Sequence, residues 1–279
     1  MTINLKKQTT MKQYIKRYLP LASLSLALCL GGCEGNDAAG TDLPPVSVSL
    51  FTKTLSGEPE SGASARRVVV LDEGGACVAN YSFVPGSGAL SLVPGTYRMT
   101  TLSVPTGLRG LPEAGTVSGI SPDISLSFAE GEPVMPFSLS GFTELSLSAA
   151  SVYTATLSPA TAVLGLRVSG LPEGRSVGFT LAGMYASARL DGVYAGSRDY
   201  PVSASGETVC FPTPGVATLL YSVDGGEPRA LSLGRDLKAG SRLQLELDWS
   251  EELSEISVRQ VTVTSWVEGD EVNGDATLK

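Results

Sequence analysis

The sequence predicts an all-β protein made of two tandem antiparallel β-sandwich domains with Greek-key-like connections, behind a short N-terminal export signal. Three observations lead to this fold class. Apolar and polar residues alternate in many short runs, Gly- and Pro-rich turns separate the runs, and no run beyond the N-terminus shows a helical apolar repeat. Alternation with period two places one face of a strand against a core and the other face in water. Many such strands separated by turn residues are typical of β-sandwiches.

The alternation is clearest in a few runs along the chain. In chain order, their same-face residues are Val46, Val48 and Leu50; Ile124, Leu126 and Phe128; Leu145, Leu147 and Ala149; Val177, Phe179 and Leu181; and Leu243, Leu245, Leu247 and Trp249. Turn signals stand at residues 72–75, 85–88, 94–95 and 224–226. Gly, Pro and Asp favour the backbone conformations that tight turns need. We therefore expect a strand at each run and a turn at each of these signals.

The last alternating run contains a phase slip. Ile256 and Val258 occupy even positions, whereas Val261 and Val263 occupy odd ones. A strand keeps both pairs on one face only if an extra residue is inserted between them. We predict a β-bulge or a strand break near residues 259–260. Two short strands, or one strand buried on both faces, are the alternatives.

A few short sequence similarities between the two halves of the chain are compatible with two related sandwiches. Leu-Pro-Glu occurs at residues 111–113 and again at 171–173, and residues 92–96 and 237–241 each lead into an alternating run. We place the domain boundary within residues 141–150. The predicted N-terminal sandwich covers residues 46–145, and the predicted C-terminal sandwich covers residues 146–279.

The first 32 residues have the parts of an export signal. Five basic residues and no acidic one precede a 12-residue apolar run at 19–30, and Leu-Gly-Gly then precedes Cys33. The run is too short to span a bilayer as a helix, but its length and flanks suit a secretory signal. The ending resembles the lipobox of bacterial lipoproteins, which implies cleavage before Cys33 and lipidation of that residue. An ordinary secretory signal with an incidental cysteine is the alternative.

A lipidated Cys33 predicts a protein that is held to a membrane surface without spanning it. Two or more acyl chains hold a protein firmly, whereas one chain holds it only marginally. The small and polar residues after Cys33 end in two prolines, so we interpret residues 33–45 as a lipidated tether. No later stretch of the sequence reaches the length of apolar residues that a second membrane segment needs.

The composition excludes several classes of function. Removing the signal leaves 247 of the 279 residues, with 15 basic side chains against 28 acidic ones, a net charge of −13. So acidic a chain repels phosphate backbones, and we predict no nucleic-acid partner. The chain has no histidine, which removes the usual general base and the usual zinc ligand. We predict no enzymatic activity, no catalytic residue, no cofactor and no metal site.

Two cysteines remain after the signal and Cys33 are set aside. Cys77 and Cys210 stand 133 positions apart, in different predicted domains. An exported protein meets an oxidising compartment, where a disulfide between them is possible. We predict two buried thiols that pack as small apolar side chains, with the disulfide as the alternative.

The order of parts resembles the fimbrillin superfamily, the subunits of type V pili in Gram-negative anaerobes. The resemblance rests on residues 92–97, on residues 237–241 and on residues 256–269, which end in Ser-Trp-Val-Glu-Gly. It is closest to FimB-type minor or anchor subunits, and it implies a lipid-anchored, surface-exposed protein of the cell outer membrane. It further implies a role in pilus assembly and cell adhesion through β-strand pairing with other fimbrial subunits.

The same resemblance raises the question of proteolysis. Shaft subunits of that family lose their first strand to a protease that cuts after Arg or Lys, whereas anchor subunits keep it. Lys53, Arg66 and Arg67 follow the first predicted strand and are the candidate cleavage points. We interpret them as ordinary exposed basic residues and favour an uncleaved anchor or accessory subunit.

A surface glycan-binding lipoprotein of a nutrient-uptake system is the alternative function. Trp249 and Trp266 are candidate sugar-stacking platforms, although their alternating runs favour a core position. Other polar groupings favour solvated turns or tails over a sugar site, a carboxylate pair or a calcium loop. These are Asp191, Tyr194, Asp199 and Tyr200; Glu251, Glu252 and Glu255; and Asp270, Glu271, Asn273 and Asp275. Glu34 and Asp37 faintly resemble an acidic surface-export signal.

Overall fold

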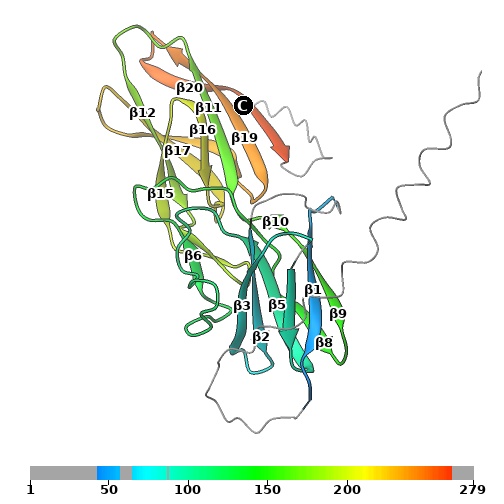
Figure 1. Cartoon of the computed structure of the whole chain (residues 1–279). Coiled ribbons are helices and arrows are strands. Elements are labelled where there is room, and N and C mark those ends of the chain that lie inside the picture. Colours follow the sequence, from blue (N-terminus) through cyan, green and yellow to red (C-terminus); the bar gives the residue numbers. More distant parts are fainter. Residues whose placement is uncertain (1–42, 57–64, 87, 266–279) are drawn as a thin grey trace, which may run out of the picture. The chain divides into compact units, whose positions relative to one another are not determined.

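The computed structural model describes residues 43–56, 65–86 and 88–265. These residues form twenty β-strands and no helix, which confirms the all-β prediction (Figure 1). Most strands pair antiparallel in several sheets, as expected for sandwich domains. Within the described part of the chain, no helix is long and apolar enough to cross a membrane.

The first lobe packs two sheets against each other. One sheet has β1 between β4 and β9, and the other has β2 between β3 and β5, with β8 and β7 on the far side of β5 and β10 beside β7. The bounds are β1 Val46–Lys53, β2 Arg66–Asp72, β3 Cys77–Phe83, β4 Gly88–Leu92, β5 Gly95–Ser103, β7 Ser138–Leu139, β8 Thr143–Leu147, β9 Ser151–Thr156 and β10 Ser158–Pro159. Buried side chains of both sheets, including Val48, Leu50, Val70, Met99 and Tyr153, form a core between them.

The second lobe also consists of two sheets. Their strand orders are β16-β11-β19-β20 and β15-β12-β17-β18. The bounds are β11 Ala162–Ser169, β12 Val177–Met184, β15 Arg198–Val202, β16 Ser205–Cys210, β17 Val216–Val223, β18 Arg229–Asp236, β19 Ser241–Ser250 and β20 Glu255–Ser265. Buried leucines at alternate positions of β11 and β19 face the core of this lobe.

A small third sheet ties the long β5–β7 connection to the second lobe. Its order is β14-β13-β6, with bounds β6 Ser125–Ser127, β13 Ser187–Arg189 and β14 Tyr194–Ala195. Phe128 and Phe137 of this connection pack against Phe211, with ring centroids 6.3 and 6.0 Å away. The larger hydrophobic core therefore contains side chains from strands of both lobes, those before β10 in the sequence and those from β11 onward.

The predicted alternation is confirmed in the runs that matter most. Along β19, residues 243, 245, 247 and 249 are all buried, and the residues between them are half-buried. Residues 48 and 50 of β1 and residues 179 and 181 of β12 behave in the same way. Two predicted strands are shorter than expected: Ala149 is exposed and lies beyond the end of β8, and Ile124 and Phe128 lie just outside β6.

The phase slip in the last strand is a β-bulge, as predicted. Gln260 stands opposite Glu246, and Val258 stands opposite Leu247, the next residue of β19. Arg259 is therefore the extra residue, and its insertion lets Ile256 and Val261 both be buried although their positions differ in parity.

Two of the predicted turns close antiparallel hairpins. The turn at residues 72–75 joins β2 to β3, with the Gly75 N–H donating to the Asp72 carbonyl at 3.0 Å. The turn at residues 224–226 joins β17 to β18. The signals at 85–88 and 94–95 instead lead into and out of β4, which belongs to the opposite sheet from β3 and β5.

The sheets draw strands from both sides of the predicted boundary at residue 145. That residue lies within β8, which pairs with β5, and β9 pairs with β1. The chain thus completes the sheets of the first lobe before it enters β11 at Ala162. The division of the chain into domains at residues 145 and 146 stays a prediction.

Candidate functional site

β1 is the strand on which the strand-pairing hypothesis depends, and it lies inside its sheet. It pairs antiparallel with β4 and parallel with β9. Val48 and Leu50 are fully buried and Thr52 is nearly so, because alternate residues of the strand point between the two sheets. The Tyr153 hydroxyl of β9 donates to the Met99 carbonyl of the facing sheet at 3.2 Å. Without β1, a groove lined by this apolar core would open along the sheet.

The candidate cleavage residues occupy two different settings. Lys53 is the last residue of β1, where it pairs with Thr156. Arg66 and Arg67 begin β2, which pairs with β3 on one side and β5 on the other. A protease that cuts after either arginine would have to pull a central strand out of its sheet.

Arg67 also has a structural role that contradicts its interpretation as an ordinary exposed residue. Its guanidinium donates to the Asn80 side-chain oxygen and to the Pro112 carbonyl, both at 3.1 Å. Burial lowers the pKa of Arg67 below its usual value, while the charge of Glu113 acts in the opposite direction. The arginine is half-buried because the segment around Pro112 crosses over it.

Asn80 joins the same segment to the outer edge of β3. Its side-chain nitrogen donates to the carbonyls of Glu113 and Thr116 at 2.8 Å, and its backbone carbonyl accepts from the Gly115 N–H at 2.7 Å. Sequence reasoning missed this residue, although a polar amide within a strand run was a visible signal. Residues 112–116 thus cover part of the β3 edge.

Neither Cys77 nor Cys210 forms a disulfide. Cys210 is fully buried, and burial raises the pKa of its thiol to about 12. Cys77 is half-buried, and burial raises the pKa of its thiol as well, in spite of hydrogen bonds to backbone carbonyls that act in the opposite direction. Both residues behave as packed thiols, although Cys77 is less buried than predicted.

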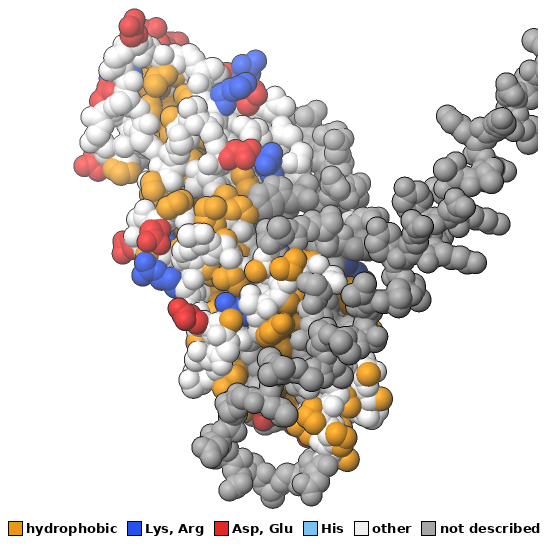
Figure 2. Space-filling model, viewed as in Figure 1, with side chains coloured by type: hydrophobic (Ala, Val, Ile, Leu, Met, Phe, Trp, Pro, Cys, Tyr) orange, Lys and Arg blue, Asp and Glu red, His pale blue; other side chains and the backbone are white. Residues whose placement is uncertain are grey.

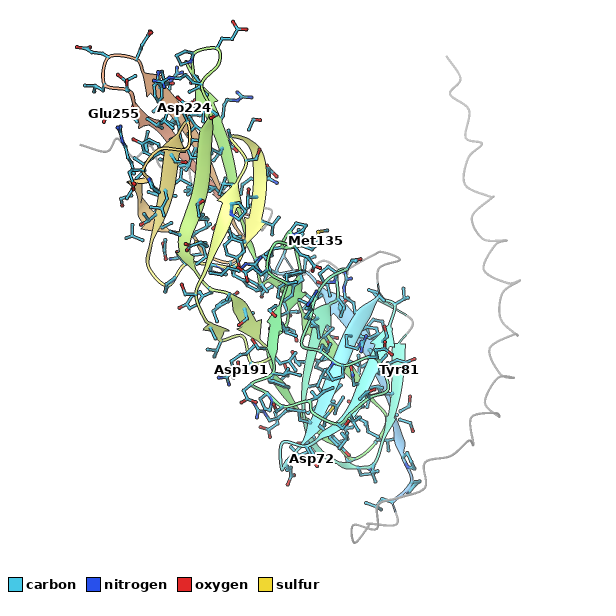
Figure 3. All side chains as sticks on the ribbon, turned by 90° about the vertical axis from the view of Figure 1, so that its left-hand side faces the viewer. Asp72, Tyr81, Met135, Asp191, Asp224 and Glu255 are labelled. Atoms are coloured by element: carbon cyan, nitrogen blue, oxygen red, sulfur yellow. The ribbon has the colours of Figure 1, made fainter. Side chains whose placement is uncertain are left out.

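The four polar residues weighed as a sugar site do not form one cluster: Asp199 and Tyr200 line one hollow and Tyr194 lines another. Tyr200 is buried and its hydroxyl donates to the Tyr185 carbonyl at 3.0 Å. Asp199 accepts from the Gly183 N–H at 2.8 Å. Asp191 pairs with Arg189 at 2.5 Å, at the tip of the β13–β14 hairpin (Figure 3).

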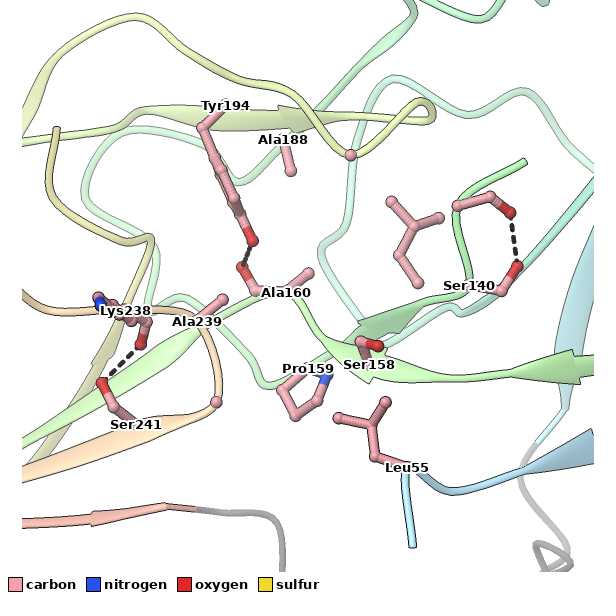
Figure 4. Close-up of a pocket in the computed structure, with 14 residues that line it drawn as sticks. Leu55, Ser140, Ser158, Pro159, Ala160, Ala188, Tyr194, Lys238, Ala239 and Ser241 are labelled. Carbon is pink, nitrogen blue, oxygen red and sulfur yellow. Dashed lines mark hydrogen bonds between the residues drawn. The ribbon is translucent and has the colours of Figure 1, made fainter. Parts of the chain in front are cut away.

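Tyr194 lines a hollow of about 540 Å³ beside the β10–β11 connection (Figure 4). Its hydroxyl donates to the Ala160 carbonyl at 3.1 Å, and burial raises its pKa to about 12. The rest of the lining is mostly small side chains and backbone, with Lys238 as its one charged residue. Among the residues described, no acid–base pair faces this hollow. It could therefore hold a small molecule by its shape, but it has few groups that could bind or react with one.

A second hollow, of about 1320 Å³, is more polar. It includes Arg198, which donates to the carbonyls of Phe128 and Ala129 at 3.0 Å and lies 5.0 Å from the centre of the Tyr200 ring. Glu207, on β16, pairs with Arg242 at 3.2 Å. Sequence reasoning missed Arg198, whose only signal was its position next to Asp199. These side chains could hydrogen-bond a polar ligand, but most are already engaged within the protein.

Trp249 belongs to the core, as its run predicted. It is 8% exposed, and the Arg175 guanidinium lies 5.6 Å from the centre of its ring. An indole in this position offers no open platform for a sugar. Glu251 and Glu252 are exposed and Glu255 is half-buried, at or beside the turn between β19 and β20; Figure 3 places Glu255 near the same end of the lobe as Asp224.

Several predicted sites lie outside the described residues. These are Cys33, with Glu34 and Asp37 in the tether; Trp266; and Asp270, Glu271, Asn273 and Asp275. Within the described ranges, no group of three or more acidic or cysteine side chains is placed to hold a metal ion. On the face shown in Figure 2, acidic and basic side chains of the described residues are scattered among neutral ones.

The fold is a two-lobed β-sandwich whose first strand lies inside a sheet of the first lobe. The chain matches no family model and no curated protein sequence. Among solved structures, it is similar to a candidate polysaccharide-binding protein of Bacteroides thetaiotaomicron, with a TM-score of 0.61, 11% identity, and coverage of 83% of this chain and 100% of the other.

Two further solved structures are similar to the chain in fold. A candidate adhesin of Bacteroides ovatus has a TM-score of 0.58 and 10% identity, with 84% of this chain and 95% of the other covered. The fimbrial anchor protein Mfa2 of Porphyromonas gingivalis has a TM-score of 0.55 and 15% identity, with 80% and 97% covered. The resemblance to fimbrillin-like proteins that the sequence predicted is thereby confirmed at the level of the fold. These neighbours are described as binding, adhesion and fimbrial proteins and not as enzymes.

Proposed function

We propose that this chain is a lipid-anchored protein of the cell envelope that acts as an anchor or accessory subunit of a fimbria. The observation that carries the proposal is the position of β1, which completes a sheet and a core in a fold shared with a fimbrial anchor protein. A subunit that keeps its first strand has no open groove of its own. It therefore suits the end of a fibre better than the shaft.

The setting of the basic residues supports an uncleaved subunit. Arg66 and Arg67 begin a strand that is paired on both sides, and Arg67 is tied to a neighbouring segment. All three basic side chains are half-buried, and Lys53 is the last residue of β1. Even there, a cut would leave Val48 and Leu50 buried in the core.

The proposed anchor is the lipid on Cys33, joined to the fold by the tether at residues 33–45. Val46, the first residue of β1, lies 13 positions after Cys33. An extended chain of this length reaches at most about 45 Å. The start of β1 would thus stay within about 45 Å of the membrane surface.

The test has two parts, one for the lipid and one for the partner. Cys33→Ser should abolish incorporation of radiolabelled palmitate and release the protein from the membrane fraction. Wild-type protein should co-purify with fimbrial subunits, and cells that lack the protein should shed or fail to anchor their fimbriae. Fimbriae that form and anchor normally without the protein, together with no bound subunit, would refute the proposal.

A glycan-binding function is the second candidate, and the polar hollow beside Arg198 favours it. One structural neighbour is described as a candidate polysaccharide-binding protein. The test is electrophoresis of the protein through gels that contain starch, xylan or mucin. Retention that Glu207→Gln weakens would support this function, whereas unretarded migration in all three gels would count against it.

A further inference from the structure

The two lobes repeat one topology. In each lobe the first strand pairs antiparallel with one strand and parallel with a later one, and the second strand pairs antiparallel on both sides. The corresponding strands, in chain order, are β1 and β11, β2 and β12, β3 and β15, β4 and β16, β5 and β17, β8 and β18, and β9 and β19. Seven strands of the first lobe therefore have counterparts in the second.

β20 is the strand that breaks this correspondence. It turns back after β19 and pairs antiparallel along that strand. After β9 the chain instead runs through β10 into β11. Among the described residues, β9 pairs with β1 only, so no described strand of the first lobe covers the edge that corresponds to the one β20 covers in the second.

The β9 edge also lacks the features that usually protect an exposed strand. Ser151–Thr156 reads Ser-Val-Tyr-Thr-Ala-Thr, with no charge, no proline and no glycine, and its ladder with β1 is regular. Val152 is 60% exposed on its outer face. Natural edge strands are commonly blunted by charges, prolines or bulges, because an open edge invites another strand.

Other edges of the structure do carry such protection. β15 contains Pro201 and begins with the charged residues Arg198 and Asp199, and β18 has charged residues at both ends and a register shift against β17. The bulge at Arg259 interrupts β20, and residues 112–116 cover part of β3. β4 is also uncharged, but its counterpart β16 is likewise an edge, so no covering strand is missing there.

We infer that the β9 edge receives an extended segment of a partner polypeptide, antiparallel to β9, as β20 is to β19. This inference rests on the proposed function and names the surface through which it acts. β20 shows the chemistry required, because its apolar residues occupy the face toward the core and polar ones the outer face. Backbone pairing supplies the affinity of such strand addition, and the alternate side chains supply its specificity.

The sequences of the remaining parts of this chain disfavour such a strand. Residues 34–42 and 57–64 have no large apolar side chain, and the alternating residues 272–279 include a glycine and an aspartate, both depleted in strands. β20 itself is engaged with β19. The segment is therefore expected from another chain, and the fimbrial subunits of the proposed function are its source.

The first test uses a peptide copied from β20. Omitting Arg259 from residues 255–264 gives Glu-Ile-Ser-Val-Gln-Val-Thr-Val-Thr, which has its four apolar residues on one face. Fluorescence anisotropy of the labelled peptide should show saturable binding to the full chain and none for a scrambled peptide. Val152→Lys should weaken this binding by about tenfold or more, because a charge at the edge opposes strand addition.

Val216→Lys is the matched control, since Val216 is also 60% exposed but lies on β17, which is paired on both sides. It should leave the binding unchanged, and circular dichroism should show both variants folded. No binding by the wild type, or equal loss in both variants, would overturn the inference. A dimer of the chain that Val152→Lys dissociates would overturn it too, because the occupant would then be a second copy.

The second test separates this inference from the proposed function. Fimbrial subunits should co-purify with the wild type and with Val216→Lys, and be lost with Val152→Lys. Subunits that co-purify equally with all three would overturn the β9 edge as the docking surface while leaving the fimbrial role intact. The absence of subunits from the wild type would instead refute the proposed function.

Discussion

Replacing Leu50 by alanine tests whether β1 is an integral part of the first lobe. Leu50 is fully buried, and it stands opposite Gly88 on β4 and Tyr153 on β9. Gly88 has no side chain with which to fill the space that the leucine leaves. Since buried Leu→Ala changes cost about 2.7–5 kcal/mol and cost most where the site cannot relax, we expect a loss of about 4 kcal/mol.

The control is Phe51→Ala, one residue further along the same strand. Phe51 is 42% exposed on the outer face, so we expect a loss of about 1 kcal/mol or less. Urea unfolding followed by circular dichroism measures both changes in the free energy of unfolding. Equal losses for the two variants would show that the two faces of β1 are not distinguished as the structure describes, and the reasoning would be refuted.

Three further changes have predicted outcomes. Gly110→Ala should destabilise the protein by at least about 1–3 kcal/mol in the same urea assay, because Gly110 has a φ of +101° and an added Cβ would lie 1.8 Å from a backbone oxygen; Gly115→Ala, with no atom within 4 Å, should cost less. Deleting Arg259 should cost no more than about 1 kcal/mol, because it removes the extra residue of the bulge and an exposed ion pair only; a collapse of the thermal midpoint would contradict this. Burial raises the pKa of Tyr194 and Cys210 to about 12, above their ordinary values of 10.0 and 9.0. Their contribution to stability is therefore full below pH 9 and is lost as the pH rises toward 12, so urea midpoints should fall over this range, and less steeply in Tyr194→Phe.

Much of the fold could be predicted from local patterns in the sequence. The period-two run ending at Trp249 became β19, and the change of parity between Val258 and Val261 became a bulge at the predicted residues. These features are local, because the side-chain period of a strand and the insertion of one residue are written in adjacent positions. The hairpin turns at residues 72–75 and 224–226 were predictable for the same reason.

Strand pairing was not predictable in this way. β1 and β9 pair in parallel, yet nothing in either run marks the other as its partner. The topological repeat is real, but the short sequence similarities do not follow it: residues 92–96 lead into β5 and residues 237–241 into β19, which are not counterparts. The similarity of the lobes resides in pairing geometry, which side-chain identity does not record.

The residues of the candidate site show the same difference between local and long-range information. Trp249 was correctly predicted in the core from its alternation, whereas Arg67 was misread as an exposed residue. Its burial depends on residues 112–116, which lie some 45 positions away in the chain. The open β9 edge could not be seen at all from the sequence, because it is defined by the absence of a partner strand among the residues described.

The parallel pairing of β1 with β9 delays completion of the first sheet during synthesis. Val48 pairs with Ser151, which is synthesised 103 residues later, or roughly 5–20 s later at ordinary rates of translation. Pairing over such long separations is also intrinsically slow. Throughout that interval the growing polypeptide exposes the apolar side chains of β1 and β2 that the finished core of the first lobe buries.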